Sequence, residues 1–374
     1  MTEGFIFAVC QVGAEPALKK ELSREHPEFR FSYSRPGFVT FKRVDPAHAL
    51  TPDFELKSVF ARQYGLSIGK AGSKESSDEE RARAVKQSFE EIRANLGNAG
   101  KNLNLHVFES DQYAPGEEPL GFVPGARAKS ARAAIAAEMK SSFPELEINA
   151  RSLTGETVLD VIVVEPHEWW LGLHEHGRAR SADPGGRPTA KDLELPSEAP
   201  SRAYLKLEEG LAWSGAPIRK GDTAVEIGSA PGGASYALLK RGVSVTGVDP
   251  GKMDSVVLKM PGYRHIEKPV FYVERKELPS KVDWLLCDMN VDPKVAITSS
   301  DRLMRELRDS LLGLLLTVKL NKWEMAADVP GMIDYLKKSG LVRVRARQLA
   351  NNRQEIFIYG LTRKGVSRLT ENRA

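Results

Sequence analysis

A glycine-rich segment in the second half of the chain carries the clearest sign of chemistry. It runs Val-Glu-Ile-Gly-Ser-Ala-Pro-Gly-Gly from Val225, a pattern typical of a buried strand that ends in a turn before a helix. Glycine adopts backbone conformations barred to other residues and lets the main chain approach a ligand closely. We therefore expect a cofactor to bind here. The residues expected to contact it are Glu226, Gly228, Ala230, Pro231, Gly232 and Gly233.

The spacing of these glycines narrows the class of cofactor. Three residues separate Gly228 from Gly232, which differs from the G-x-G-x-x-G dinucleotide pattern and argues against a nicotinamide cofactor. The next expected strand, 243–248, ends at Asp249, whose carboxylate could accept hydrogen bonds from both ribose hydroxyls of an adenosyl group. A glycine-rich turn can also be purely structural. The acid at the end of the next strand is what favours a cofactor site.

The elements that must position this loop alternate between strand and helix patterns. They cover residues 223–227, 234–241, 244–248, 284–287, 304–311, 313–319, 329–339, 343–349 and 355–360. Such alternation builds a mostly parallel sheet with helices on both faces, and ligands bind at the carboxyl ends of the strands. Asp288 and Lys319 lie at such ends. We therefore predict an α/β domain over residues 201–374.

The first half of the chain has another organisation. Residues 1–70 are predicted to form a small α+β unit, with a strand, a helix and a hairpin at 5–10, 15–24 and 29–41. Residues 71–183 are predicted to form a second α+β unit, with helices at 77–96 and 128–143 and strands at 103–108 and 158–164. The segment 184–200 is rich in Pro, Gly and charge and is predicted to be a linker.

Composition excludes several classes of protein. The 374 residues exceed what a single core usually serves, and no apolar run reaches the roughly 18 residues of a membrane span. The start of the chain lacks the basic region of a signal peptide, so we expect a cytoplasmic protein. The net charge of +4 permits an anionic partner without requiring one.

The two cysteines and the one histidine cluster do not predict a metal site. Cys10 and Cys287 lie in apolar runs, which suits buried thiols in a reducing compartment. His167, His174 and His176 fall in the segment HEWWLGLHEH, which is typical of a strand with a polar face. We therefore assign no metal.

Several motifs together resemble one enzyme family. The loop EIGSAPGG, with SRAYLKLEE before it and LLCDMN, TVKLNK and NNRQEIFIYG after it, resembles the FtsJ-like ribose 2'-O-methyltransferases. Within that group the chain is most similar to the RlmM-type 23S ribosomal RNA (cytidine-2'-O)-methyltransferases. The likeness extends upstream through GAEPALKKEL and FARQYG and so covers nearly the whole chain.

This resemblance implies a fold, a cofactor and a partner. It implies a Rossmann-like methyltransferase domain that binds S-adenosylmethionine, preceded by a ferredoxin-like unit and a THUMP-type RNA-binding unit. The implied partner is RNA, and specifically 23S ribosomal RNA. Two departures concern the adenine side of the cofactor. Ala234 stands where relatives often have an aromatic residue, and Pro269 stands where an acid is expected, with Glu267 the nearest carboxylate.

The family uses a Lys-Asp-Lys-Glu tetrad, which falls here on Lys206, Asp288, Lys319 and Glu355. The resemblance implies that Lys319 is the general base and that Asp288 orients it and favours the positive sulfonium. Lys206 and Glu355 would tune the charge and position the substrate.

The chemistry explains why such a set would be needed. A ribose 2'-hydroxyl is a poor nucleophile at neutral pH, so its attack on a methyl group benefits from a base. A lysine serves as that base only if much of it is neutral. Burial and a second cation lower the pKa of a lysine, whereas carboxylates raise it. We expect the two lysines and two acids to balance these effects.

Other functions stay open from the sequence. Arg343, Arg345, Arg347 and Arg353, with Lys322 and Lys252, could hold RNA phosphates, but a solvated sheet edge explains them equally well. The protein could methylate a different RNA, or be an RNA-binding relative that has lost turnover. A base methyltransferase is disfavoured, because Met-Asn-Val-Asp follows Asp288 in place of an Asn-Pro-Pro-Tyr type motif. The oligomeric state and the target nucleotide stay open.

Overall fold

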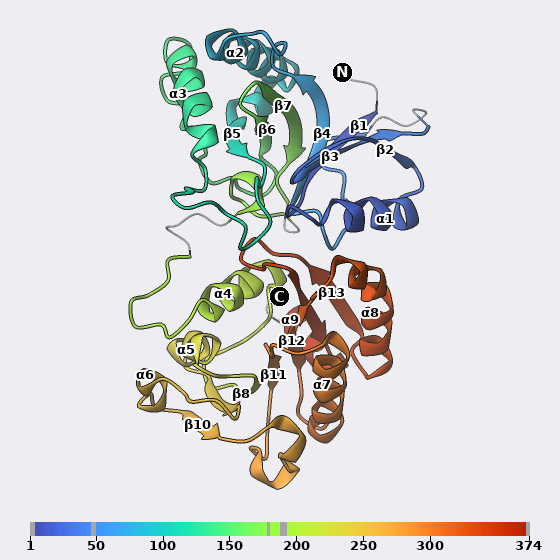
Figure 1. Cartoon of the computed structure of the whole chain (residues 1–374), viewed down its shortest axis with the longest axis vertical. Coiled ribbons are helices and arrows are strands. Elements are labelled where there is room, and N and C mark those ends of the chain that lie inside the picture. The colour runs from blue at the N-terminus through green and yellow to red at the C-terminus, as the bar shows by residue number, and fades with distance from the viewer. Residues whose placement is uncertain (1–3, 46–49, 178–179, 188–192, 372–374) are drawn as a thin grey trace. The chain divides into compact units, whose positions relative to one another are not determined.

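The computed structural model describes residues 4–45, 50–177, 180–187 and 193–371. The chain divides into two compact units, Met1–Thr189 and Ala190–Ala374 (Figure 1). Within the described residues, no helix is both long enough and apolar enough to cross a bilayer.

The N-terminal unit is built on one mixed sheet. Its strands are β1 (Phe5–Val9), β2 (Phe29–Arg35), β3 (Phe38–Arg43), β4 (Gln63–Lys70), β5 (Asn104–Glu109), β6 (Thr157–Glu165) and β7 (Glu168–Glu175). They are ordered β2-β3-β1-β4-β7-β6-β5, and only the β5–β6 pair is parallel. Its helices are α1 (Glu15–Glu25), α2 (Asp78–Asn95) and α3 (Arg127–Met139), with a 3-10 turn η1 at Gly97–Asn102.

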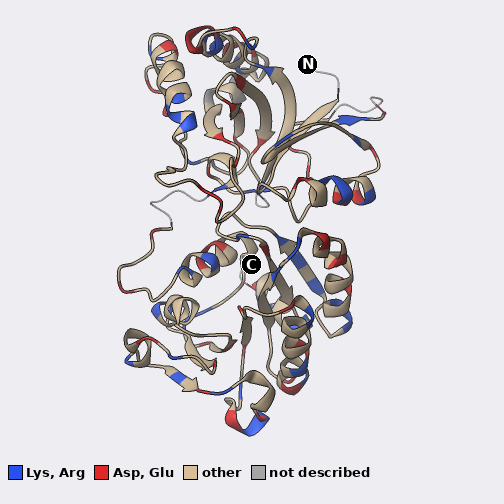
Figure 2. Cartoon of the chain, in the orientation of Figure 1, with Lys and Arg blue, Asp and Glu red and all other residues tan. Residues whose placement is uncertain are grey.

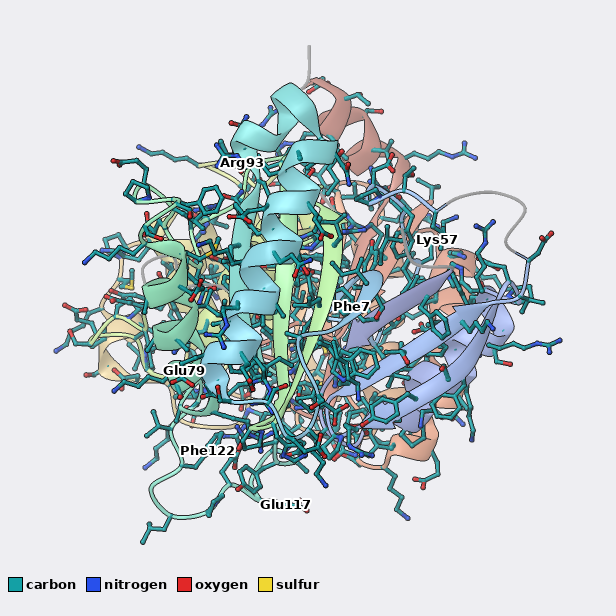
Figure 3. The ribbon with its side chains drawn as sticks, turned by 90° about the horizontal axis from the view of Figure 1, so that it is seen from above. Phe7, Lys57, Glu79, Arg93, Glu117 and Phe122 are labelled. Atoms are coloured by element: carbon teal, nitrogen blue, oxygen red, sulfur yellow. The ribbon has the colours of Figure 1, made fainter. Side chains whose placement is uncertain are left out.

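Helices α2 and α3 cover the β5–β6–β7 part of this sheet. Val85 and Phe89 of α2 and Ile135 of α3 are buried in one cluster with Leu159 and Val161 of β6. Helix α2 starts at a capping box, in which Ser77 and Glu80 satisfy each other's main-chain N–H groups. Figure 3 shows α2 lying over the strands, with Glu79 and Arg93 near its two ends.

The sheet crosses the predicted division at residue 70. Strand β4 pairs with β1 on one side and with β7 on the other, so strands from residues 1–70 and 71–183 share one sheet. Two separate sheets would leave the edges of β4 and β7 unpaired, and pairing them satisfies their main-chain groups. The ferredoxin-like and THUMP-type assignments stay predictions.

The predicted linker 184–200 begins with ordered structure. Its first residues form a 3-10 turn, η2 (Pro184–Gly186), whose glycines are buried. A side chain at Gly185 would meet the ring of Phe108 at 2.8 Å, so this turn packs on the N-terminal unit. Residues 188–192 of the linker lie outside the described residues.

The C-terminal unit has the predicted mostly parallel sheet. Its strands are β8 (Thr223–Ile227), β9 (Ser244–Val248), β10 (Tyr263–Ile266), β11 (Trp284–Cys287), β12 (Gly313–Lys319), β13 (Arg343–Arg347) and β14 (Glu355–Leu361). They are ordered β10-β9-β8-β11-β12-β14-β13. The pairs from β10 to β12 are parallel, and β14 alone runs against its neighbours.

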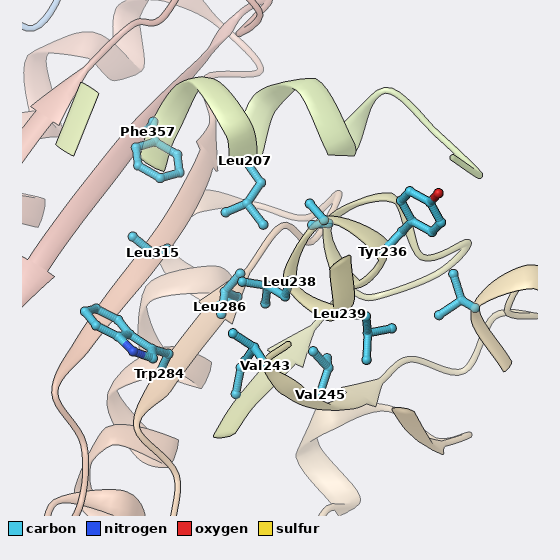
Figure 4. Close-up of a cluster of buried hydrophobic side chains, with 14 of the residues drawn as sticks. Leu207, Tyr236, Leu238, Leu239, Val243, Val245, Trp284, Leu286, Leu315 and Phe357 are labelled. Carbon is cyan, nitrogen blue, oxygen red and sulfur yellow. The ribbon is translucent and has the colours of Figure 1, made fainter. Parts of the chain in front are cut away.

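Helices surround this sheet. They are α4 (Ala203–Ser214), α5 (Gly233–Lys240), α6 (Ser255–Leu258), α7 (Pro293–Leu307), α8 (Val329–Lys338) and α9 (Arg363–Glu371). Two 3-10 turns, η3 (Val270–Tyr272) and η4 (Arg275–Glu277), lie between β10 and β11, and a third, η5 (Trp323–Asp328), precedes α8. Leu207 of α4 and Leu238 of α5 pack with Leu286, Leu315 and Phe357 of the sheet (Figure 4). This core holds α4 against the strands.

Candidate active site

Three strand ends meet at one edge of the C-terminal sheet and carry three charged side chains. Asp288 follows β11, and Lys319 is the last residue of β12, which is parallel to β11. Because β14 runs antiparallel to β12, its first residue, Glu355, lies directly opposite Lys319 in the register. The sheet topology therefore places the three residues together.

Helix α4 supplies a fourth charged side chain. Lys206 Nζ lies 2.6 Å from Glu355 Oε1 and 3.6 Å from Asp288 Oδ2. Lys319 Nζ donates to Asp288 Oδ1 at 3.0 Å and also to Glu355 Oε2. Each amine thus contacts both carboxylates. The structure brings all four residues of the predicted tetrad into one cluster.

Burial and charge oppose each other at this cluster. Burial alone would lower the pKa of Lys319, but the carboxylates of Asp288 and Glu355 more than offset it and hold the pKa above that of an ordinary lysine. Burial alone would raise the pKa of Glu355, and the ammonium groups of Lys206 and Lys319 hold it below the ordinary value. The prediction that opposing effects balance at the pKa of Lys319 is therefore wrong for the protein without ligands. The two acids raise this pKa by more than burial lowers it.

The glycine-rich loop lies directly against this cluster. Gly228 has φ of +80°, and a Cβ there would lie 2.7 Å from the main-chain oxygen of Asp288. Gly232 has φ of +118°, and a Cβ there would lie 2.8 Å from Val257. A side chain would be strained and obstructed at both positions. The loop keeps its shape because glycine occupies them.

The loop also contacts the helix that carries Lys206. A Cβ added to Gly233, the first residue of α5, would collide with Ser201 Oγ and lie 2.9 Å from the main-chain nitrogen of Tyr204. The start of α5 therefore packs against the start of α4. The predicted contact residues Ala230 and Pro231 lie in the same loop, and the main-chain N–H of Ala230 donates to Asp249 Oδ2 at 3.1 Å.

The two acids beside the loop have partners within the protein. Asp249 accepts main-chain N–H groups from Ala230 and, at 2.6 Å, from Gly251. Glu226 is 2% exposed and accepts a hydrogen bond from the Ser235 hydroxyl. Burial raises the pKa of Glu226 to about 8, against the Ser235 hydrogen bond and with help from the nearby carboxylate of Asp288. Glu226 therefore lies beneath the loop, where it supports α5.

The cysteines and histidines are part of the packing. Both thiols are free and buried, as predicted, and burial raises the pKa of Cys287 to about 12. His174 is buried, and its Nδ1 lies 2.6 Å from Asp160 Oδ2. In the part of the chain that the structure describes, no three His, Cys, Asp or Glu side chains are arranged to hold a metal ion.

The predicted arginine row on β13 becomes more buried along the strand. Arg343 is exposed, Arg345 lies 4.4 Å from the centre of the Trp213 ring, and Arg347 is 7% exposed. Figure 2 shows this basic strand at the edge of the sheet. Arg347 is therefore not available to bind phosphates, because it is buried. Arg353, Lys322 and Lys252 are exposed.

The residues expected on the adenine side of the cofactor differ in burial. Ala234, in the first turn of α5, is 7% exposed and belongs to the buried core of the C-terminal unit. Pro269 and Glu267 are exposed at the loop that follows β10.

Two polar residues beside the tetrad were missed from the sequence. Asn352 Nδ2 lies 3.4 Å from Glu355 Oε1, and Glu209 lies on α4 one turn after Lys206. The spacing of Lys206 and Glu209 on one helix, three residues apart, is a signal that could have been used.

A profile of the FtsJ-like methyltransferase family matches residues 199–364. This region is therefore similar to FtsJ-like methyltransferases. The matched range contains the glycine-rich loop and all four tetrad residues.

Proteins similar to this chain include two ribosomal RNA large subunit methyltransferases M. That of Alkalilimnicola ehrlichii is 31% identical over 209 residues, which cover 51% of this chain and 55% of that protein. That of Photorhabdus asymbiotica is 31% identical over 222 residues, which cover 57% and 59%. The chain thus spans little more than half the length of these relatives. Among solved structures, TrmN from Thermus thermophilus aligns with 96% of this chain and 99% of that chain, at 13% identity and a TM-score of 0.34.

Proposed function

We propose that the protein transfers a methyl group from S-adenosylmethionine to the 2'-hydroxyl of a ribose in RNA, with a cytidine of 23S ribosomal RNA as its target. One observation carries this proposal. Two lysines and two acids form a closed cluster at the sheet edge, and the main chain of Asp288 lies against Gly228 of the cofactor loop. This arrangement supports a proton acceptor beside the expected methyl donor.

The loop fits an adenosyl cofactor. Gly228 and Gly232 give the loop a backbone conformation that favours glycine, and the two oxygens of Asp249 each accept one N–H group and retain a further lone pair. Asp249 follows β9, next to the loop after β8, so both features lie at the carboxyl ends of neighbouring strands. When bound, S-adenosylmethionine supplies an electrophilic methyl group on a positively charged sulfur.

Lys319 Nζ is the proposed proton acceptor. Only its free amine can take the proton of the 2'-hydroxyl, so Lys319 must first lose the proton that Asp288 and Glu355 stabilise. The cluster carries two positive and two negative charges when both lysines are protonated, and a net charge of −1 when Lys319 is neutral. Lys206, held by Glu355, then keeps a positive charge beside Lys319 and opposes its reprotonation.

The substrate class rests on the similar proteins and on the N-terminal unit. The similar proteins from Alkalilimnicola ehrlichii and Photorhabdus asymbiotica are named for methylation of ribosomal RNA of the large subunit. We assign RNA binding to the N-terminal unit as a ferredoxin-like and THUMP-type region. Lys129 of its helix α3 and Lys140, the residue after that helix, are exposed and could neutralise phosphates.

A transfer assay tests the proposal. The protein is incubated with labelled S-adenosylmethionine and ribosomal RNA that lacks its natural modifications, and any 2'-O-methyl group is mapped. We expect Lys319→Ala to bind the cofactor as the unchanged protein does and to lose transfer by roughly 10²- to 10⁴-fold, the contribution of a general base.

The exposed Lys338 of α8 provides the control, since Lys338→Ala should transfer normally. Full activity in Lys319→Ala would refute the assigned base. Methylation confined to another RNA would refute the substrate, and cofactor binding without transfer to any RNA would identify a relative that has lost turnover.

A further inference from the structure

The turn between β13 and β14 comes immediately before Glu355 and is held by its own side chains. Asn352 Oδ1 accepts the main-chain N–H of Leu349 at 3.0 Å, and Gln348 Nε2 donates to the main-chain oxygen of Arg353 at 3.1 Å. Asn352 and Gln348 are buried. The turn therefore has one defined conformation, which sets where β14 starts.

A carboxylate on α4 binds this turn from outside. Glu209 is 6% exposed, and its Oε1 accepts the main-chain N–H of Ala350 at 2.8 Å. Its Oε2 accepts both the main-chain N–H and the side-chain amide of Asn351, at 2.7 and 2.9 Å. Hydrogen bonds to a charged acceptor are about twice as strong as those between neutral groups. Glu209 thus fixes α4 to the turn through three donors.

The same helix contacts Glu355 one turn earlier. Lys206 lies three residues before Glu209, so both side chains project from the same side of α4. Lys206 binds Glu355 Oε1 at 2.6 Å, and the same oxygen lies 3.4 Å from Asn352 Nδ2 in the turn. Helix, turn and Glu355 therefore form a closed set of contacts, with Glu209 at one end and Lys206 at the other.

The packing leaves the helix little freedom to compensate. A Cβ added to Gly210, the residue after Glu209, would collide with the ring of Phe357 in β14. Helix α4 therefore lies directly on the strand, and a small shift of the helix changes the distance from Lys206 to Glu355.

We propose that Glu209 is a positioning residue for the methyl transfer, which holds Lys206 against Glu355 by clamping α4 to the β13–β14 turn. Its role is indirect, because its hydrogen bonds run to the turn. This inference rests on the proposed function and assigns a role that the tetrad itself does not contain.

The proposal predicts the direction of the kinetic change. Without the clamp, Lys206 moves away from Glu355 and from Lys319, and a positive neighbour of Lys319 is lost. The two carboxylates then hold the proton of Lys319 more firmly, so less free amine is present at a given pH. The pH dependence of transfer should shift towards higher pH, and kcat at neutral pH should fall.

Substitutions at Glu209 measure this effect. We expect Glu209→Ala to lower kcat by about tenfold or more, a shift of one unit in the pH dependence corresponding to tenfold, while the KM for S-adenosylmethionine stays within about twofold. Glu209→Gln retains one acceptor oxygen and should lie between Glu209→Ala and the unchanged protein. The effects of Glu209→Ala and Lys206→Ala should overlap in the double variant, because both remove the same contact.

The neighbouring Glu208 gives a matched control. It lies on the same helix, but its carboxylate accepts a hydrogen bond from Arg241, the residue that follows α5. Glu208→Ala should leave kcat, KM and the pH dependence unchanged. If Glu209→Ala lowers only the melting temperature and keeps the kcat and pH dependence of the unchanged protein, the positioning role is overturned. Effects of Glu209→Ala and Lys206→Ala that simply multiply would overturn it as well.

A readout that needs no RNA separates this inference from the proposed function. The ammonium group of Lys206 can be followed by nuclear magnetic resonance in protein with ¹⁵N-labelled lysine, with Lys206→Arg to assign the signal. Faster proton exchange at this group in Glu209→Ala, and not in Glu208→Ala, is expected. An unchanged signal would overturn the clamp. Failure of the unchanged protein to methylate any RNA would overturn the proposed function and leave this result to decide the role of Glu209.

Discussion

Lys319 is held in its charged form by the same side chains that place it in the proposed reaction site. Asp288 and Glu355 both accept hydrogen bonds from its ammonium group. A base in this position is rigid, since two hydrogen bonds fix its nitrogen, but it is rarely neutral. The two carboxylates therefore fix the position of the base but reduce the fraction of it that is the free amine. This fraction depends on pH, so the rate of transfer should depend on pH as well.

The raised pKa of Lys319 predicts an alkaline rate profile. Because the free amine is the active form, its fraction below the pKa grows about tenfold with each pH unit. The kcat/KM for RNA, which reports the free protein, should rise at that rate from about pH 7 to 9 without a plateau. Initial rates measured at subsaturating RNA would check this. An inflection near neutral pH would show that another group controls the proton transfer.

Residue identity and residue environment differ in how far they can be predicted from sequence. The four tetrad positions followed from short motifs, and the structure brings them together. The pKa of Lys319 did not follow, because it depends on distances of 2.6 to 3.6 Å between residues as much as 149 positions apart in the chain, from Lys206 to Glu355. Glu209 was missed because two of the three donors that it binds in the turn are main-chain N–H groups, which a sequence pattern does not reveal.

The conformation of the glycine-rich loop after β8 depends on its glycines. Gly228→Ala would combine a positive φ with a contact of 2.7 Å to the main chain of Asp288. The conformation alone costs about 1–3 kcal/mol in a residue other than glycine, and the contact would push Asp288 away from Lys319. We expect a lower free energy of unfolding and a weaker affinity for S-adenosylmethionine, measured by chemical denaturation and by calorimetric titration.

Gly331 provides the contrasting substitution. It lies in α8 without a positive φ, and nothing lies within 4 Å of an added Cβ. Gly331→Ala should therefore stabilise the domain, by up to about 1 kcal/mol from helix propensity, and leave cofactor affinity unchanged. Equal effects of the two substitutions would show that the loop conformation is not critical.

Elements with a strong apolar pattern were predicted well, and elements defined by their neighbours were not. Strand β12 matches the predicted range 313–319, because its seven residues form a nearly continuous apolar run. Helix α4 was recognised only as a motif, since its pattern is weak until it packs on α5 and β14. Strand β4 was missed, because its sequence, QYGLSIGK, contains two glycines that weaken a strand pattern.

At the scale of the whole molecule, each unit has its own core. One cluster of buried residues draws only on the C-terminal unit, and two others draw only on the N-terminal unit. A fragment of residues 193–374 should therefore fold alone and bind S-adenosylmethionine with an affinity similar to that of the full chain. Its kcat/KM for ribosomal RNA should fall by about 10²-fold, because the unit that we propose to bind RNA is no longer linked to it.

Circular dichroism, calorimetric titration and the transfer assay measure these three properties of the fragment. Adding the N-terminal unit as a separate chain is the control, and it should restore little activity, since the linkage is missing. A fragment that methylates ribosomal RNA as efficiently as the full chain would contradict an RNA-binding role for the N-terminal unit.

The central place of β4 in the first sheet limits how this protein can be dissected or recombined. Strand β4 bonds β1 through one edge and β7 through the other. A gene fragment that stops after residue 70 would encode β1 to β4, in which β4 lacks its partner β7. The unpaired main-chain groups of β4 could then pair with a second copy of the fragment. Fusion partners and protease sites are therefore better placed beyond Gly186 than inside the first sheet.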